Sequence, residues 1–220
     1  MGKKLIFTII NAFLFVSSII VTYVTLTRGT VAGQVDTGEQ VGWFYIVTFT
    51  VESNIFLGLV AGASTIFGIR SLFNHRPLPK ALSTWYLIAA SSAMLTCLTV
   101  VFFLAPVRAA SGRNYFDMLI GPMFFFHFFN PVLAAITLIF FTDQNKLTLK
   151  SRLLSILPPA IYAIPYIINV VILENWPDFY GVTFGGQIIF IPLVFLAFCL
   201  IIFAISSTLS YCHNRKIALK

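Results

Sequence analysis

Six long apolar stretches dominate this chain and limit how it can fold. They cover residues 5–26, 43–69, 81–105, 118–141, 153–173 and 187–211. An α-helix needs about 20 mainly apolar residues to cross a bilayer, and each stretch is long enough. Lipid offers no partner for free backbone groups, and the stretches are too long to be barrel strands. The sequence therefore predicts an all-α, polytopic membrane protein in which residues 1–220 form one six-helix bundle.

The composition agrees with a chain dissolved in lipid. Hydrophobic residues make up 59% of the chain and charged residues 10%, whereas soluble domains are about 25% charged. The net charge of +7 comes from Lys and Arg residues scattered in short groups between the apolar stretches. Nucleic-acid-binding proteins gather such residues on one solvated face, so we expect no nucleic-acid partner. The three cysteines show no metal-binding spacing, and we expect neither a metal nor a cofactor.

The distribution of basic residues predicts an orientation. The N-terminus, segments 70–80 and 142–152, and the C-terminal tail hold eleven of the 14 Lys and Arg residues. The other connecting segments hold only Arg28, Arg108 and Arg113. Cytoplasmic segments of membrane proteins carry an excess of Lys and Arg. We therefore expect both termini in the cytoplasm and, most simply, a location in the plasma membrane.

Two ionisable side chains fall deep within the predicted spans. Glu52 lies nine residues beyond Trp43, where the second span begins, and His127 lies ten residues beyond Asp117 in the fourth. At 1.5 Å per residue, each lies roughly 13–15 Å below the outer surface. Such residues are costly in lipid and usually face the bundle interior or a water-filled cavity. Glu52 and His127 are therefore candidate functional residues.

Other polar residues share the outer half of the predicted bundle. They are Ser18, Thr22, Thr50, Ser53, Asn54, Thr96, Asn130, Asn169 and Gln187. Their concentration predicts a polar cavity reached from the outer leaflet. Gly58 and Gly62 follow in a G-x-x-x-G step, which predicts a close contact with another helix.

Two short motifs suggest a chemistry. The second span contains Phe49-Thr50-Val51-Glu52-Ser53-Asn54, and in the fourth His127 is followed four residues later by Pro131. With six spans, these motifs resemble the androgen-induced-gene-like family of membrane proteins, especially its bacterial relatives. Animal members of that family look like threonine hydrolases that cleave fatty acid esters of hydroxy fatty acids. The resemblance implies Thr50 as the nucleophile and His127 as its base.

The chemistry implied by the resemblance is coherent. A threonine hydroxyl is a poor nucleophile unless a neighbouring base takes its proton. Glu52 or Asn130 could fix the tautomer of His127, and Asn54 could donate to an oxyanion, with Ser53 in support. The chain would then be an intramembrane hydrolase or an acyl-transfer enzyme with membrane lipids as its partners, and a lipid ester would reach the site laterally within the bilayer. Thr48, two residues before Thr50, is an alternative nucleophile.

Two other functions remain open. Glu52 and His127 could form a titrating pair in a small transporter or proton-coupled carrier. Alternatively, the polar residues could only hold the helices of a non-catalytic scaffold protein together. The sequence leaves the oligomeric state open.

Overall fold

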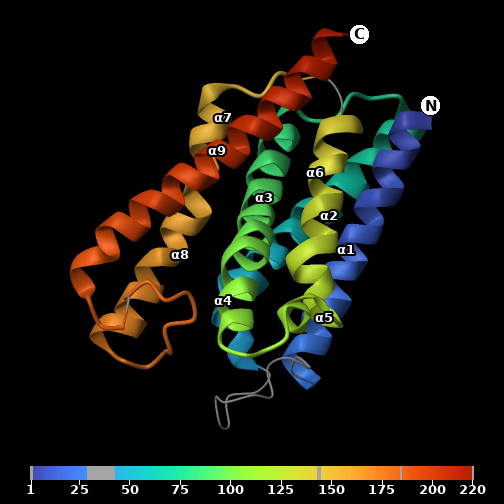
Figure 1. The fold of residues 1–220 in the computed structure, drawn as a ribbon. Coiled ribbons are helices and arrows are strands. Elements are labelled where there is room, and N and C mark those ends of the chain that lie inside the picture. Colours follow the sequence, from blue (N-terminus) through green and yellow to red (C-terminus); the bar gives the residue numbers. More distant parts are fainter. Residues whose placement is uncertain (1, 29–42, 143–144, 184, 220) are drawn as a thin grey trace.

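The structure, a computed structural model, describes residues 2–28, 43–142, 145–183 and 185–219 (Figure 1). All regular secondary structure within these residues is helical. The elements are α1 (Gly2–Arg28), η2 (Trp43–Val47), α2 (Phe49–Asn74), α3 (Lys80–Thr99), η3 (Val100–Leu104), α4 (Ala105–Ala110), η4 (Tyr115–Leu119), α5 (Pro122–Phe124), η5 (Phe125–Phe129), α6 (Asn130–Phe140), α7 (Leu149–Leu154), α8 (Leu157–Ile167), η6 (Ile168–Ile172), η7 (Ile188–Phe190) and α9 (Ile191–Ala218).

Six helical segments are long and apolar enough to cross a membrane. They are Gly2–Thr27, Phe49–Asn74, Lys80–Ala110, Pro122–Phe140, Leu149–Ile172 and Ile188–Ala218. The predicted all-α architecture with six spans is therefore confirmed, and the chain is a multi-pass membrane protein. The fourth span begins later than expected because Gly121, with a φ of 55°, separates it from the short helix η4.

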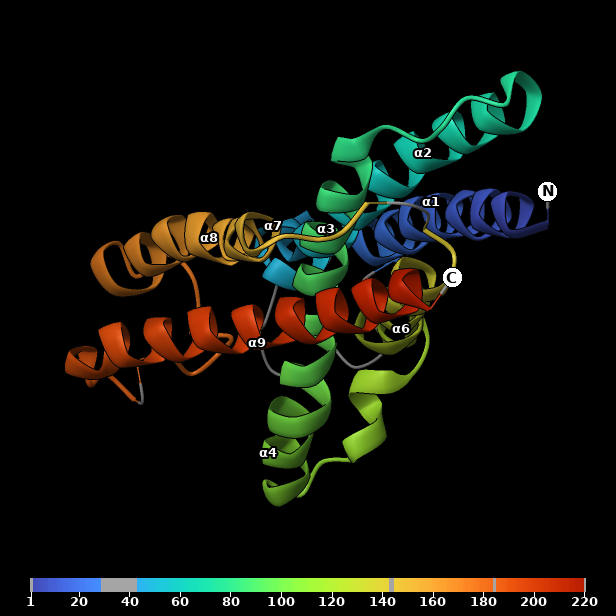
Figure 2. The ribbon, with the colours of Figure 1, turned by 90° about the horizontal axis from the view of Figure 1, so that it is seen from above.

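The helices form two unequal groups around α3. On one side, α1 packs along α2, and α6 closes the group against α1 and α3 (Figures 1 and 2). On the other side, α8 and α9 run next to each other, and α9 also contacts α3 and α6. The start of α1 and the end of α9 lie at the same end of the bundle (Figure 1); this is the terminal end. Residues 29–42, within the longest expected loop, lie outside the described residues.

The predicted glycine contact is confirmed, and its partner is α1. An added Cβ at Gly58 would lie 2.8 Å from Cβ of Ser18, and one at Gly62 would lie 2.8 Å from a ring carbon of Phe15. The absence of side chains at these glycines lets the two helix backbones approach closely. Ser18 therefore faces α2 at a glycine contact.

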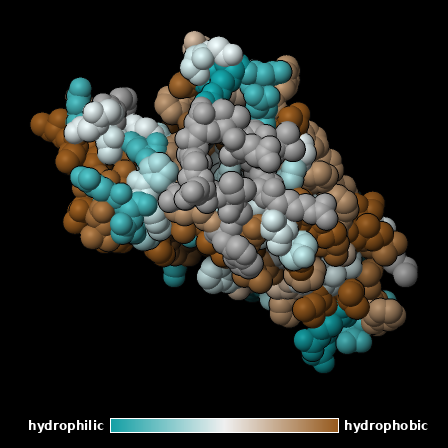
Figure 3. All heavy atoms as spheres, turned by 90° about the horizontal axis from the view of Figure 1, so that it is seen from below, coloured by the Kyte–Doolittle hydropathy of each residue, from teal (hydrophilic) through white to brown (hydrophobic). Residues whose placement is uncertain are grey.

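The surface of the bundle matches a lipid environment. Apolar side chains along the last two spans are strongly exposed, among them Ile161 at 64%, Ile172 at 69% and Leu193 at 62%. Seen from the end opposite the termini, apolar side chains extend along the flanks, and hydrophilic ones lie in separate groups (Figure 3). In water so much exposed apolar surface would favour aggregation, whereas in lipid it carries no such cost.

We expect the two glycine positions to differ in their tolerance of a methyl group. Gly58→Ala should lower the thermal stability of the purified protein in detergent by about 1–3 kcal/mol, because the new methyl meets a Cβ fixed to the α1 backbone. Gly62→Ala is the matched control and should cost less, since the Phe15 ring can rotate away. Equal losses for both variants would show that the close approach at Gly58 does not limit packing.

Candidate functional site

Buried polar side chains link the first four spans to one another. Ser17 of α1 donates to Oδ1 of Asn130 in α6 at 3.0 Å, and the hydroxyls of Ser53 in α2 and Thr96 in α3 are 3.2 Å apart. Asn54 of α2 donates to the carbonyl of Phe126 in η5 at 3.2 Å. These residues, Ser17, Ser53, Asn54, Thr96 and Asn130, form the polar layer. All five are buried, and pairing across helices satisfies much of their hydrogen-bonding capacity, although Oδ1 of Asn54 and Nδ2 of Asn130 have no partner.

Asn54 connects the two motifs that carry the family resemblance. Its Nδ2 donates both to the carbonyl of Thr50, at 2.9 Å, and to the carbonyl of Phe126, at 3.2 Å. Because one nitrogen atom contacts both oxygens, the carbonyl oxygens of Thr50 and Phe126 lie close together. Since Phe126 directly precedes His127, Thr50 and the histidine segment lie at the same level of two touching helices. Both amide protons of Asn54 are used in these bonds, so it has none to give to an oxyanion.

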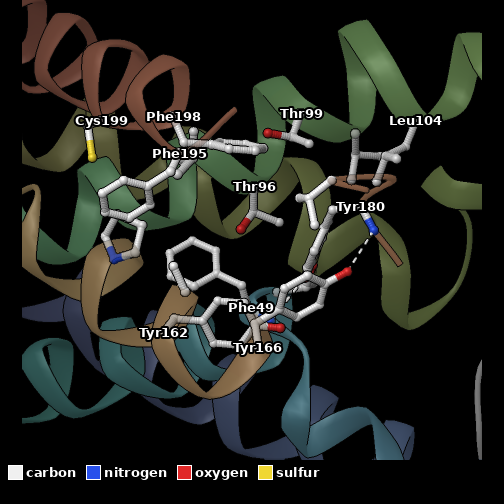
Figure 4. Close-up of a pocket in the computed structure, with 16 residues that line it drawn as sticks. Phe49, Thr96, Thr99, Leu104, Tyr162, Tyr166, Tyr180, Phe195, Phe198 and Cys199 are labelled. Atoms are coloured by element: carbon white, nitrogen blue, oxygen red, sulfur yellow. Dashed lines mark hydrogen bonds between the residues drawn. The ribbon is translucent and has the colours of Figure 1, made fainter. Parts of the chain in front are cut away.

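Thr50 lines a small cavity in the half of the bundle away from the termini (Figure 4). The cavity has a volume of about 80 Å³ and lies between α2, α3, α8 and α9. Its polar groups are the hydroxyls of Thr50, Thr96 and Thr99 and those of three tyrosines, and the rest of its wall is largely aliphatic or phenyl. The cavity is therefore more apolar than the sequence predicts.

Tyrosines close the outer side of this cavity. The Tyr180 hydroxyl accepts a hydrogen bond from the backbone N–H of Phe49 at 3.0 Å and also interacts with Thr50. Tyr162 donates to the carbonyl of Val47 at 2.9 Å. The hydroxyl of Tyr166 accepts from the backbone N–H of Tyr180 at 3.2 Å (Figure 4). These contacts attach the fifth span and the segment after it to the start of α2.

Asp178 organises the segment that carries Tyr180. Its carboxylate accepts from the Tyr166 hydroxyl at 2.8 Å, from Val182 N–H at 3.0 Å, and from the N–H and hydroxyl of Thr183 at 2.8 and 2.7 Å. Partial burial raises the pKa of the Asp178 carboxyl, but these hydrogen bonds outweigh it and leave the pKa below its ordinary value.

His127 lies in a widened turn and has a defined tautomer. Residues Phe125–Phe129 are π-helical, and the backbone N–H of Asn130 reaches back to the carbonyl of Phe125. Pro131 explains this turn, because a proline has no N–H for the carbonyl four residues earlier and its ring clashes with that carbonyl. The imidazole is 3% exposed, and its Nδ1 lies 2.6 Å from the carbonyl oxygen of Met118. A carbonyl only accepts, so Nδ1 carries the proton and Nε2 is the free acceptor.

The side chains of Thr50 and His127 are near in level but are not hydrogen-bonded to each other. Among the interactions of the described residues, the imidazole pairs with Met118 and the Thr50 hydroxyl with Tyr180. Asn130 pairs with Ser17 rather than with the histidine. The histidine tautomer is therefore set by a backbone carbonyl, and neither Glu52 nor Asn130 sets it.

Thr48 has a structural task that separates it from Thr50. It is the N-cap of α2: its hydroxyl accepts from the backbone N–H of Val51 at 3.4 Å and donates to the carbonyl of Tyr45 at 2.8 Å. An N-cap side chain satisfies a backbone donor that the helix leaves unpaired. Of the two threonines, only Thr50 lines the cavity.

Glu52 faces a second, much larger space. A groove of about 1030 Å³ runs between α2 and α3 on one side and α7 and α8 on the other, and Glu52 is an exposed residue in its wall. His127 lines neither this groove nor the cavity of Thr50. Neither Glu52 nor Thr50 therefore shares the groove or the cavity with His127, and this holds equally for a carrier built on Glu52 and for a hydrolase built on Thr50.

Several residues of the site were not identified from the sequence, because they belong to no recognisable motif. Tyr162 and Tyr166 stand four residues apart and so share a helix face, which is a signal that a sequence can offer. Asp178 and Tyr180 lie in a connecting segment, where no periodicity predicts their inward orientation. In the described part of the chain, no group of three or more His, Cys, Asp or Glu residues is placed to hold a metal ion.

The Asp178 network should make stability depend on pH. A carboxyl with a lowered pKa stabilises the fold above its unfolded pKa, about 3.9, and this stabilisation is lost as the pH falls through the folded value. The thermal midpoint in detergent should therefore fall more between pH 6 and pH 3 for the wild type than for Asp178→Asn. Asp117→Asn, a carboxyl at the same end but outside the network, should keep the wild-type profile. Identical profiles for wild type and Asp178→Asn would contradict this assignment.

Comparison with known proteins adds no relative to these observations. No family model, no curated protein and no solved structure matches the chain. A function must therefore be argued from the geometry and from the motifs themselves.

Proposed function

We propose that this protein is an intramembrane hydrolase that cleaves lipid esters, with Thr50 as nucleophile and His127 as general base. The observation that carries the proposal is the bridge made by Asn54. It joins the Thr50 carbonyl to the residue before His127, beside a cavity that Thr50 lines. The motif resemblance to androgen-induced-gene-like proteins supports the same pair.

The state of His127 suits a base. With the Nδ1 proton held by the Met118 carbonyl, Nε2 has a lone pair and can accept a proton. In hydrolytic triads an acceptor behind the histidine fixes the same arrangement, there as a carboxylate. Nε2 must reach the Thr50 hydroxyl directly or through one water, and catalytic hydrogen bonds are often long before substrate binds.

The reaction has two steps. The Thr50 oxygen attacks the ester carbonyl carbon while His127 takes its proton. The bond to the leaving alkoxide then breaks, and that proton passes to the alkoxide to release an alcohol. Water, deprotonated by His127, next attacks the acyl-threonine, releases a fatty acid and restores the hydroxyl. Tyr180, whose hydroxyl adjoins Thr50, is the phenol best located to donate to the oxyanion.

The size of the cavity defines what can bind beside Thr50. A volume of about 80 Å³ has room for a few water molecules but is smaller than the 300–1,000 Å³ or so of ordinary ligand sites. The ester group and a few carbons fit there. The rest of a lipid ester must extend into the bilayer, and the mainly apolar wall favours acyl chains over polar substrates.

The proposal also covers location and orientation. The distribution of Lys and Arg supports a plasma-membrane protein with both termini in the cytoplasm. The Thr50 cavity, away from the terminal end, would then lie in the outer half of the bilayer.

Substitutions test the catalytic pair. Thr50→Ala and His127→Ala should each lower turnover of long-chain acyl esters by at least about a hundredfold, because each removes a partner of the proton transfer. Turnover is measured in proteoliposomes with p-nitrophenyl esters of several chain lengths. An acyl-enzyme trapped at Thr50 and identified by peptide mass spectrometry would assign the nucleophile.

Two matched variants serve as controls. Thr99→Ala removes another hydroxyl of the same cavity and should keep most of the turnover. Thr48→Ala removes the helix cap and should cost about 1 kcal/mol of stability without abolishing turnover. The hydrolase is excluded if the folded Thr50 and His127 variants cleave every tested ester as fast as the wild type.

Reporter fusions test the orientation. Alkaline phosphatase fused after Lys220 should be inactive and green fluorescent protein there should fluoresce, because the C-terminus is expected in the cytoplasm. Phosphatase fused after Gly112, in the connection between the third and fourth spans, should be active. The opposite pattern at both sites would reverse the orientation.

A further inference from the structure

The groove that contains Glu52 has a different character from the Thr50 cavity. Its walls are mostly apolar, with Phe56, Trp85, Ile88, Leu157 and Ile161 among the residues that line it. The residues lining α7 and α8 run from Lys150 to Pro165, a rise of about 22 Å at 1.5 Å per residue. This exceeds the roughly 15 Å of hydrocarbon in one leaflet, so the groove can hold an acyl chain along its length.

Positive charge gathers at one end of the groove. Lys80 begins α3, Lys146 precedes α7, and Lys150 lies in its first turn; all three are exposed and line the groove at the terminal end of the bundle. Among the described lining residues, Glu52 is the only acidic one, and it belongs to the first turn of α2, at the opposite end of that helix. The groove is thus positive at its terminal end and negative at its far end.

The mouth of the groove is held together by hydroxyl groups. Thr84 of α3 and Ser151 of α7 are 3.1 Å apart between hydroxyl oxygens, and Ser151 is also 3.3 Å from the hydroxyl of Thr148. These contacts fix α7 against α3 just inside the three lysines. The three lysines thus line an opening whose walls are joined by hydrogen bonds, and a preformed site loses less free energy to ordering on binding.

We propose that the groove binds an anionic phospholipid from the leaflet on the terminal side of the bundle. The headgroup phosphate lies among Lys80, Lys146 and Lys150, and one acyl chain runs along Trp85, Leu157 and Ile161. Ammonium groups attract a phosphate as point charges, and basic pockets between membrane helices recognise anionic headgroups in this way. The carboxyl of Glu52 disfavours the reverse orientation. This site is separate from the hydrolase proposal, because it does not involve Thr50 or His127.

Basic residues are common at this end of the bundle, so the experiment must separate the groove from general surface charge. Trp85 lines the groove and is 53% exposed, and it can report on nearby lipid once Trp43 and Trp176 are replaced by Phe. This single-tryptophan protein is reconstituted in phosphatidylcholine vesicles containing brominated phosphatidylglycerol or, at the same mole fraction, brominated phosphatidylcholine. We expect the glycerol lipid to quench Trp85 at least about twice as strongly, because it concentrates at the lysines.

Two triple variants, each of which removes three positive charges, are then compared in the same quenching measurement. Replacement of Lys80, Lys146 and Lys150 by Gln should abolish the extra quenching. Replacement of Lys3, Arg70 and Arg76, which are basic residues in segments of the same end but do not line the groove, should preserve it. Equal quenching by the two lipids in the parent protein would overturn the proposal. Equal loss in both variants would also overturn it, since the preference would then be a property of the whole surface.

Two tryptophan substitutions test lipid binding in the groove by a second method. Leu157→Trp fills the groove, whereas Leu153→Trp places the same side chain at an equally exposed position outside it; the two leucines are 48% and 49% exposed. Native mass spectrometry of protein extracted from mixed vesicles should show phosphatidylglycerol bound to the wild type and to Leu153→Trp, and at least about fivefold less bound to Leu157→Trp. Equal binding by all three would place the lipid elsewhere. Thr50→Ala should bind like the wild type, so failure of the hydrolase proposal would leave this result unaffected.

Discussion

The hydrogen bonds of Asn54 join the second and fourth spans of this bundle. In lipid, helices gain no hydrophobic stabilisation from each other, and their association depends on close packing and on polar contacts between them. One carboxamide here joins the Thr50 carbonyl in α2 to the Phe126 carbonyl in η5. Ser53 adds α3 through Thr96, and Asn130 adds α1 through Ser17. Each such bond contributes only about 0.6 kcal/mol on average, but together they fix which helix faces meet.

Close packing between α1 and α2 adds to the stabilisation that these hydrogen bonds provide. The glycines of α2 remove side chains where α1 crosses, so that Ser18 reaches the α2 backbone. The hydrogen-bonding residues and the glycines lie on neighbouring turns of α2. Together they explain why α1 and α2 pack along each other. The fifth span is linked to the residues before α2 through the hydroxyl of Tyr162, and the last two spans leave most of their residues at the surface. A groove can therefore exist between α8 and the rest of the bundle.

The sequence predicts the architecture well because the bilayer imposes it. Length and apolar composition suffice to locate six helices. Of the polar residues expected to share one depth, Ser53 and Thr96 meet, whereas Asn169 bonds within its own helix and Gln187 is exposed. The neighbours of Glu52 could not be predicted. It lines a groove beside α3 and α8, and no periodicity in the sequence states which helices lie next to each other.

Other features of the site depend on backbone detail that a sequence does not display. Pro131 in the sequence predicts an irregular turn. It does not predict the π-helical geometry that directs His127 to the Met118 carbonyl. Tyr180 reads as an interfacial aromatic residue, yet its hydroxyl enters the bundle because Asp178 folds the segment around it. The pairing of Thr50 with His127 is still a proposal, since the motifs give the residues and the Asn54 bridge gives only their common level.

The bond between Tyr180 and the start of α2 has a consequence for biosynthesis. The backbone N–H of Phe49 and the hydroxyl that satisfies it are 131 residues apart in the chain. While the ribosome is still making the third and fourth spans, the first turn of α2 has no such partner. The cavity beside Thr50 thus acquires its outer wall only after the fifth span has been inserted and Tyr180 has been synthesised, so a truncated chain that ends before this tyrosine contains the nucleophile without its enclosure.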